Sequence, residues 1–329
     1  MVGLKNKNFS HPERANKMIW KGLVFFLLLT TWLAAFTAEP FSGQYSRHQF
    51  KIDQSIRNYG VYVPAKARHG ASLLIMLHAS QQSEALFRTW LGSEFDEQAE
   101  KYNFIVAFPD GIDNHWNECR SNASYTANQA GIDDVTFLSA LIKSLTSEYQ
   151  VNEKQVFVAG YSNGGHMAFR LALEKPELMR GIGIFSASLP SPENSDCQSS
   201  GIAVSIASFN GTTDPISPYL GGTVRVGTDA SRGTVLSVPA SVGYWRALAE
   251  LPETSQRQIL PEVDGNPHSR VILDRWFHPD NAVEVRLYTL EGSGHVVPSL
   301  TLEYPPISGG RAADISGAAE LLAFFSQLK

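Results

Sequence analysis

The chain has 329 residues, of which 43% are hydrophobic and 18% are charged, with a formal net charge of −5. This composition is typical of a globular protein with enough apolar material for a large core. A nucleic-acid partner is not expected, because neutralising phosphates requires clustered Lys and Arg side chains.

The N-terminal segment reads as an export signal. Residues 22–38 are apolar, and Lys17 and Lys21 precede them; the uncharged core, 23–36, suits a signal peptide and is short for a membrane span. An uncleaved membrane anchor is the alternative, and only then is a membrane partner expected.

One boundary, between residues 38 and 39, follows from this interpretation. Residues 1–38 are expected to be the signal peptide or anchor, with Met18 as an alternative start, and residues 39–329 a single domain. Such a protein is predicted to be secreted or periplasmic, in the extracellular region.

Strands and helices are predicted to alternate along this domain, after an opening pair of short strands. The strands are expected at 48–53, 58–64, 72–78, 103–109, 154–160, 181–188, 201–211 and 282–292, and the helices at 95–102, 133–149, 164–175, 238–251 and 314–329. This order predicts an α/β fold, with a mostly parallel, doubly wound sheet, an antiparallel N-terminal edge and helices on both faces.

One strand-to-helix junction carries a candidate nucleophile. The segment Gly160-Tyr161-Ser162-Asn163-Gly164 matches the pattern G-x-S-x-G, with a strand predicted before it and a helix after it. That context holds the serine on a tight turn, where larger flanking residues clash with the strand and the helix. An ordinary serine in a glycine-rich turn is the alternative, since the pattern alone also arises by chance.

Two later loops supply the partners that a serine hydroxyl needs. Asp214 follows the strand predicted at 201–211, and His295 follows the strand predicted at 282–292. The order Ser, acid, His is that of a nucleophile–acid–base triad in this kind of fold. Alone, Asp214 also suits a turn and His295 a surface loop. His78, His115 and His166 fit the position of the base less well.

An oxyanion hole requires two N–H donors near the serine. The backbone N–H of Asn163 is one candidate, and the loop after strand 72–78 offers Ser80 or its neighbour Ala79. Metal and nucleotide cofactors are not expected, because the sequence has no H-E-x-x-H, paired CxxC, P-loop or G-x-G-x-x-G motif.

The two cysteines, Cys119 and Cys197, both lie beyond the export signal. An oxidising compartment allows them to pair, and two free thiols are the alternative.

Seven segments together resemble the secreted polyhydroxybutyrate depolymerase-like esterases, a family of α/β-hydrolases that also contains feruloyl and acetylxylan esterases. They span roughly residues 47 to 325 and read NYGVYVP, LLIMLHASQQ, VAFPDG…W, IDDVTFLSALI, VFVAGYSNGGHMAFRLAL, FNGTTDPISPY and GSGHVVP. The resemblance implies hydrolysis of carboxylic esters through an acyl-serine, without metal or organic cofactor. It also implies that Ser162 is the nucleophile, Asp214 the acid and His295 the base.

The resemblance carries further expectations about the surroundings of the site. A disulfide between Cys119 and Cys197 is expected to brace its rim, and Trp116, Tyr161 and Tyr219 are expected to contact the substrate, with a role at the edge of the core as the alternative. One departure concerns the oxyanion loop, because the family has Gly where this chain has Ala79, and Ala adopts a positive φ only at a cost.

The substrate expected is an oligomeric hydroxyalkanoate ester of the polyhydroxybutyrate type, since the separate binding domain of many polymer depolymerases is not found in this sequence. Alternatives are a feruloyl or acetylxylan esterase acting on plant polysaccharide esters, a serine peptidase on the same fold, or a non-catalytic binding module that kept the fold.

Overall fold

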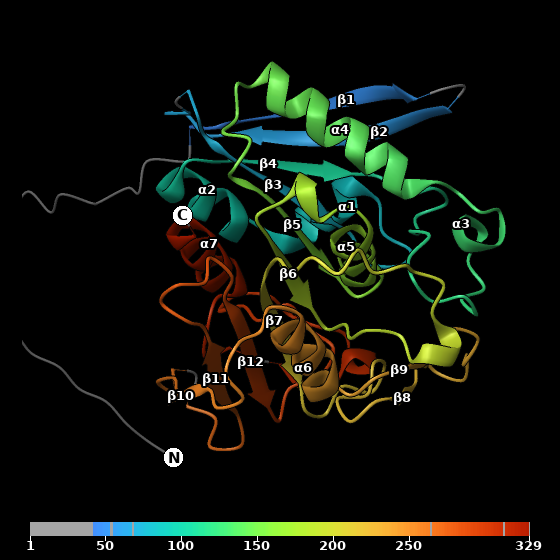
Figure 1. The fold of residues 1–329 in the computed structure, drawn as a ribbon, viewed down its shortest axis with the longest axis vertical. Coiled ribbons are helices and arrows are strands. Elements are labelled where there is room, and N and C mark those ends of the chain that lie inside the picture. Colours follow the sequence, from blue (N-terminus) through green and yellow to red (C-terminus); the bar gives the residue numbers. More distant parts are fainter. Residues whose placement is uncertain (1–41, 53–54, 68, 264, 312, 329) are drawn as a thin grey trace, which may run out of the picture. The chain divides into compact units, whose positions relative to one another are not determined.

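A ten-stranded sheet organises the described residues, which are 42–328 apart from 53–54, 68, 264 and 312 in this computed structural model (Figure 1). The predicted signal segment lies outside them. The strand order is β1-β2-β4-β3-β5-β6-β7-β12-β11-β10. The strands are β1 Gln44–Ile52, β2 Ser55–Val63, β3 Ser72–Leu77, β4 Phe104–Pro109, β5 Val156–Tyr161, β6 Gly181–Phe185, β7 Ser205–Gly211, β10 Gln256–Ile259, β11 Arg270–Trp276 and β12 Val285–Glu291, while β8 Gly222–Thr223 and β9 Thr234–Val235 form a separate pair.

The central strands from β4 to β12 are parallel, whereas both edges of the sheet are antiparallel. The α/β fold with an antiparallel N-terminal edge is therefore confirmed. The second antiparallel edge, β10 and β11, was not predicted. All four residues of β10 are exposed and three of them are polar, so the sequence there has no apolar alternation to mark a strand.

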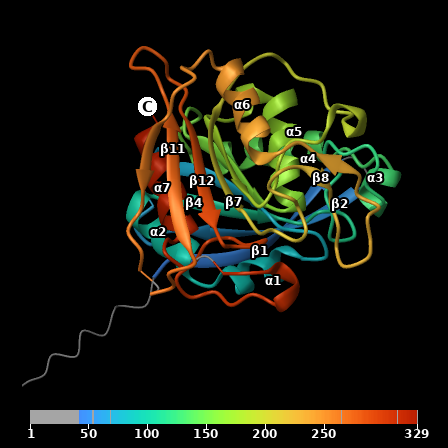
Figure 2. The same cartoon turned by 90° about the horizontal axis from the view of Figure 1, so that it is seen from below.

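Helices cover both faces of the sheet, as predicted (Figure 2). Figure 2 shows α4, α5 and α6 on one side of the sheet and α1, α2 and α7 on the other. The bounds are α1 Glu84–Leu91, α2 Glu94–Tyr102, α3 Thr126–Gln129, α4 Asp134–Glu148, α5 Asn163–Glu174, α6 Val238–Leu248 and α7 Gly317–Gln327, with 3-10 turns at Pro176–Leu178, Pro192–Asn194 and Pro306–Ser308.

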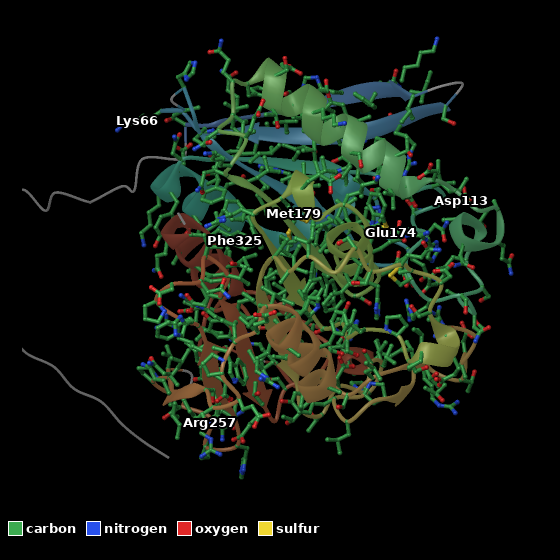
Figure 3. The ribbon with its side chains drawn as sticks, in the orientation of Figure 1. Lys66, Asp113, Glu174, Met179, Arg257 and Phe325 are labelled. Carbon is green, nitrogen blue, oxygen red and sulfur yellow. A yellow bond between two sulfur atoms is a disulfide. The ribbon has the colours of Figure 1, made fainter. Side chains whose placement is uncertain are left out.

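Alternation along the central strands divides the apolar side chains between two cores. In β3, Leu73 and Ile75 join the core beneath α4, α5 and α6, whereas Leu74 and Met76 join the core beneath α1, α2 and α7. Burying each such side chain stabilises the fold by about 1.5–3 kcal/mol. Phe325 of α7 belongs to the second core, and Figure 3 shows it among the packed side chains.

The three predicted triad residues follow three parallel strands, β5, β7 and β12, at their carboxyl ends. Parallel strands bring those ends to one edge of a sheet, so the topology gathers the loops that begin at Ser162, Thr212 and Gly292. Among the described helices, none is both long and apolar enough to cross a membrane.

Candidate active site

Ser162 sits on a strained corner between β5 and α5. Its φ is 55° and its ψ −117°, a conformation that is unfavourable for a residue with a Cβ. The corner is held by hydrogen bonds from the Ser162 N–H to the Phe185 carbonyl, 2.9 Å, and from the His166 N–H to the Ser162 carbonyl, 3.0 Å.

The flanking glycines make this corner possible. A Cβ on Gly160 would lie 2.2 Å from the Gly164 backbone, and one on Gly164 would lie 2.2 Å from the carbonyl oxygen of Leu77. Both positions therefore admit no side chain, as the G-x-S-x-G pattern requires.

The side chain of Ser162 does not cap the helix that it precedes. Ser83, Ser237 and Ser316 each accept a hydrogen bond from the backbone of the helix that follows, whereas Ser162 makes no such bond to α5. Its hydroxyl is thus not committed to the helix, and the first N–H groups of α5 lie beside it.

Asp214 and His295 form a buried, hydrogen-bonded pair. Nδ1 of His295 lies 2.7 Å from Oδ2 of Asp214, and only 4% and 8% of the two residues' surfaces are exposed. The other carboxylate oxygen of Asp214 accepts from the N–H groups of Ile216 and Ser217, each at 2.8 Å. The carboxylate is therefore fixed from both sides, and it orients the imidazole.

A cavity of about 310 Å³ lies beside this pair, and both Ser162 and His295 line it. Within the described part of the chain there is no hydrogen bond between their side chains. A nucleophile–base bond of this kind is often formed only when substrate is present. The backbone carbonyl of His295 is held by the hydroxyl of Tyr161 at 2.8 Å.

Of the two residues predicted to form an oxyanion hole, Ser80 lines the cavity itself, whereas Asn163 is buried and directly follows Ser162, which lines it. Asn163 is the first residue of α5, and Ser80 lines the cavity. Across residues 42–328, leaving aside the gaps, neither backbone N–H donates to a protein acceptor. The side chain of Asn163 is used elsewhere, since its amide bonds both the N–H and the carbonyl of Trp116, at 2.8 and 3.2 Å.

The substitution of Ala for the family's Gly at position 79 fits the loop geometry. Among the described residues of this loop, the positive φ falls on Gln81, at 64°, and not on Ala79. Gln81 is anchored in that conformation by its N–H, which donates to the Asn114 carbonyl at 2.9 Å.

Hydrogen bonds of the buried His78 ring hold the same loop, which follows β3. Its Nδ1 donates to the Ala79 carbonyl at 2.8 Å, and its Nε2 accepts from the N–H of Gly111 at 2.9 Å, so the ring is the neutral Nδ1–H tautomer. Burial lowers the pKa of His78 to about 4, which keeps it neutral.

Two of the three residues predicted to contact substrate lie elsewhere. Trp116 is completely buried, and its indole N–H donates to the His78 carbonyl at 3.0 Å, so it supports the loop and does not line the cavity. Tyr219 lines a different depression and shares a hydrogen bond with Thr289 at 3.0 Å. Trp116 belongs to the core and Tyr219 packs against it, which is the alternative role that the sequence left open, because the positions of loops in sequence do not give side-chain direction. Tyr161 does line the cavity.

Cys119 and Cys197 form the expected disulfide. The bridge joins the loop after β4 to the loop after β6, and hydrogen bonds extend the junction: Ser121 N–H to Asn194 carbonyl, 2.9 Å, and Asp196 N–H to Cys119 carbonyl, 3.0 Å. The two loops therefore act as one wall.

The cavity also has lining residues that the sequence analysis missed: Arg120 and Tyr125 on this wall, and Arg232, whose carbonyl accepts from the Asn194 amide at 3.3 Å, on the neighbouring loop between β8 and β9. Arg120 directly follows Cys119, so the long polar loop and its cysteine were a usable signal. His166, which the sequence analysis set aside as a base, also lines the cavity; burial keeps its pKa well below the usual value.

Comparison with known proteins agrees with this geometry. Residues 57–218 match the family described as Esterase PHB depolymerase, where PHB is polyhydroxybutyrate. NocK of Nocardia uniformis subsp. tsuyamanensis, named as an esterase, is 25% identical over 78% of this chain and 74% of its own length. Feruloyl esterase C of Emericella nidulans is 26% identical over a match that covers 46% of this chain and 51% of the length of that esterase.

A solved structure has the same fold. The acetyl xylan esterase from Aspergillus awamori superposes with a TM-score of 0.51 at 16% identity, covering 77% of this chain and 95% of that one. An ester hydrolase, and not a non-catalytic binding module, is the class to which these similarities point. The chain is thus similar to the polyhydroxybutyrate depolymerase-like and feruloyl esterase-like family, and it is a carboxylic ester hydrolase with an α/β-hydrolase fold.

Proposed function

We propose that the protein is a secreted serine esterase that cleaves hydroxyalkanoate oligomers of the polyhydroxybutyrate type. The observation that carries the proposal is the pair of Asp214 and His295 at a cavity that Ser162 also lines, on a corner with φ of 55°. A serine held on a strained corner, an oriented imidazole and a buried carboxylate make up the catalytic triad that performs acyl transfer.

In the proposed reaction, the Ser162 oxygen attacks the ester carbonyl carbon while His295 takes the hydroxyl proton. Asp214 stabilises the imidazolium that forms. The tetrahedral intermediate collapses, and the alkoxide leaves with the proton from His295. Water then attacks the acyl-serine with His295 again as base, releasing the acid and restoring Ser162.

The negative oxygen of the intermediate is proposed to bind the backbone N–H groups of Asn163 and Ser80. Each such donor contributes about 10²–10³-fold to the rate, because it is already oriented where charge develops. The position of Asn163 at the start of α5 adds the favourable end of the helix dipole.

Hydroxyalkanoate oligomers are favoured as substrate by the description of the matching family, Esterase PHB depolymerase. Apolar side chains of the cavity, Ile216, Val224 and Val226, suit short aliphatic acyl chains. The second candidate is a feruloyl or acetylxylan ester, favoured by the names of two similar fungal proteins, feruloyl esterase C and acetyl xylan esterase. Initial rates on 3-hydroxybutyrate dimers, acetylated xylan and methyl ferulate separate the two.

Secretion is supported by the leader-like segment at residues 22–38 and by the disulfide between Cys119 and Cys197. Disulfides persist in oxidising compartments and are rare in the cytosol. N-terminal sequencing of protein recovered from outside the cytoplasm tests this. An intact N-terminus in membrane-bound protein would instead support the anchor.

The decisive test of the chemistry is the Ser162→Ala variant. We expect kcat to fall by about 10⁶-fold, while thermal unfolding stays close to that of the native protein. A phosphonate ester inhibitor should label the native protein at Ser162 and leave the variant unlabelled. Retention of more than about 5% of the activity in the variant would contradict the assignment, since triad enzymes lose nearly all of theirs.

A further inference from the structure

One wall of the cavity contains two arginines: Arg120 on the disulfide-linked loop after β4, and Arg232 on the neighbouring loop between β8 and β9. Among the described residues that line the cavity, none is Asp or Glu. Both arginines are buried, with 1% and 8% of their surfaces exposed. Burying two cations in one wall is costly unless each N–H finds an acceptor.

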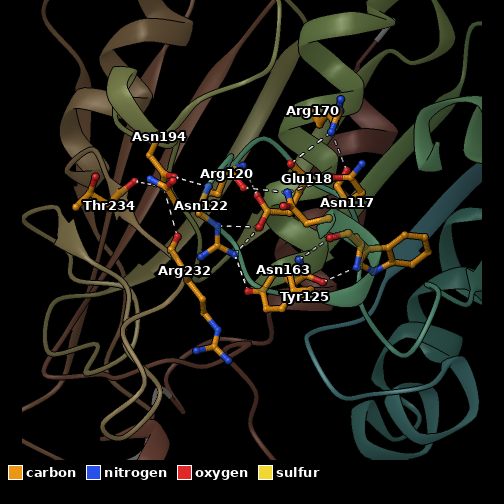
Figure 4. A network of polar contacts seen from close by, with 12 residues as sticks. Asn117, Glu118, Arg120, Asn122, Tyr125, Asn163, Arg170, Asn194, Arg232 and Thr234 are labelled. Atoms are coloured by element: carbon orange, nitrogen blue, oxygen red, sulfur yellow. Dashed lines mark hydrogen bonds and ion pairs between the residues drawn. The ribbon is translucent and has the colours of Figure 1, made fainter. Parts of the chain in front are cut away.

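Arg120 is held so that one end of its guanidinium remains free. Its Nε donates to Glu118 at 2.8 Å, and its Nη2 donates to the Tyr125 hydroxyl at 3.0 Å, as Figure 4 shows. In the described part of the protein, Nη1 has no hydrogen-bond partner although it is buried. Burial alone lowers the pKa of Arg120, but Glu118 and Tyr125 outweigh it and the net shift is upward, so the cation persists.

Tyr125 links the two arginines and adds a donor of its own. The Cζ atoms of Arg120 and Arg232 lie 5.9 and 5.5 Å from the centre of its ring. Because its oxygen accepts from Arg120, its hydroxyl proton is available to another group.

Arg232 also has a free donor. Its Nη1 pairs with Asp229, whose side chain is 47% exposed and therefore screened by water. Within the described chain its buried Nε has no partner. Each of these two guanidinium groups therefore keeps one buried nitrogen without a partner among the described residues, and the Tyr125 ring lies close to both.

We propose that this wall is a subsite for a carboxylate on the substrate, bound by Arg120 Nη1, Arg232 Nε and the Tyr125 hydroxyl. Guanidinium donors bind carboxylate oxygens strongly and with defined geometry. Resting on the proposed function, this subsite makes the preferred ester a short oligomer whose terminal carboxylate enters the cavity. A long polymer chain without a nearby carboxylate gains nothing from it.

The test compares esters with and without a free carboxylate at pH 7.5. One pair carries it on the alcohol side: the 3-hydroxybutyrate dimer and its methyl ester. A second pair carries it on the acyl side: mono(4-nitrophenyl) succinate and 4-nitrophenyl methyl succinate. In at least one pair we expect kcat/KM to be about tenfold or more higher for the free acid, the effect of a charge-assisted hydrogen bond.

Variants identify the groups responsible. Arg232→Gln should lower this preference about tenfold, and Tyr125→Phe should lower it by a smaller factor. The matched control is Arg225→Gln, because Arg225 is exposed on the same loop between β8 and β9 and does not line the cavity. It should retain the native preference. Arg120 itself is unsuitable for a single substitution, because its loss leaves buried Glu118 unpaired.

Equal kcat/KM for acid and neutral ester in both pairs, or an unchanged preference in Arg232→Gln, overturns the subsite. Failure of the proposed substrate gives a different result: neither dimer is hydrolysed, while the succinate pair still shows the preference and its loss in Arg232→Gln. The experiment therefore distinguishes failure of the carboxylate subsite from failure of the proposed hydroxyalkanoate substrate.

Discussion

Nδ1 of His295 lies 2.7 Å from Oδ2 of Asp214, while Oδ1 of the same carboxylate accepts two backbone N–H groups. This arrangement predicts the outcome of Asp214→Asn. The amide oxygen must take the place of Oδ1, because only an acceptor satisfies those two N–H groups. The amide NH₂ then faces His295 and forces the tautomer whose proton is on Nε2, which cannot accept a proton from Ser162.

We therefore expect kcat of Asp214→Asn to fall by about 10⁴-fold, with little change in stability. Steady-state kinetics on a 4-nitrophenyl ester measure kcat, and thermal unfolding measures stability. The control is Asp280→Asn, since the side chain of Asp280 is 93% exposed and does not line the cavity. A fall of less than about tenfold in the Asp214 variant would remove the acid from the proposed triad.

The sequence predicted the central α/β architecture well, because the signals there are local. The apolar strands β3, β5 and β7 are buried along their whole length or nearly so, and the elbow at Ser162 needs glycines that the sequence displays. Asp214 and His295 could be selected because their loops follow parallel strands, which end at one edge.

The cavity wall could not be predicted in the same way. Whether Trp116 or Arg120 reaches the cavity depends on how a 22-residue polar loop (110–131) folds back, and this loop is fixed by distant partners. Its disulfide to Cys197 and its hydrogen bonds to Asn194 and Asn163 join residues up to 78 positions apart. No local periodicity reports such contacts.

The tight packing behind Ser162 predicts opposite effects for two glycine substitutions. Gly164→Ala places a Cβ 2.2 Å from the Leu77 carbonyl oxygen, so we expect a loss of about 1–3 kcal/mol in the free energy of unfolding and a large loss of activity. Gly243→Ala, within α6, meets nothing within 4 Å and should stabilise the protein by about 0.5–1 kcal/mol. Urea denaturation measures both. Equal effects of the two would argue against the close approach of α5 to β3.

The disulfide should support both stability and the cavity wall. The Cys119→Ser/Cys197→Ser double variant is expected to lose about 2–4 kcal/mol of unfolding free energy, because the bridge closes a loop of 78 residues in the unfolded chain. Its kcat/KM should also fall, since Arg120 adjoins Cys119. Dithiothreitol should lower the melting temperature of the native protein and leave that of the double variant unchanged. A reductant effect of equal size in both would exclude the bridge as its cause.

The buried histidines predict that the protein loses stability in mild acid. Burial lowers the pKa of His78 from 6.5 to about 4, and it lowers that of His166 in the same direction. Between pH 6.5 and pH 4 the unfolded chain therefore binds protons that the folded protein does not. The free energy of unfolding falls as the pH falls through this window, by up to about 1.4 kcal/mol per pH unit for each histidine.

Asp96 acts in the opposite direction, because burial raises its pKa to about 6, so the histidine contribution is best isolated by substitution. His78→Asn keeps a donor for the Ala79 carbonyl but has no titrating ring. We expect its loss of unfolding free energy between pH 7 and pH 4.5 to be smaller than that of the native protein by about 2 kcal/mol, although its stability at pH 7 is lower. His278→Asn, at a site where half of the side chain is exposed, should follow the native curve. Guanidinium denaturation at the two pH values measures this, and parallel curves for all three proteins would show that His78 gains its proton in the folded state as readily as in the unfolded chain.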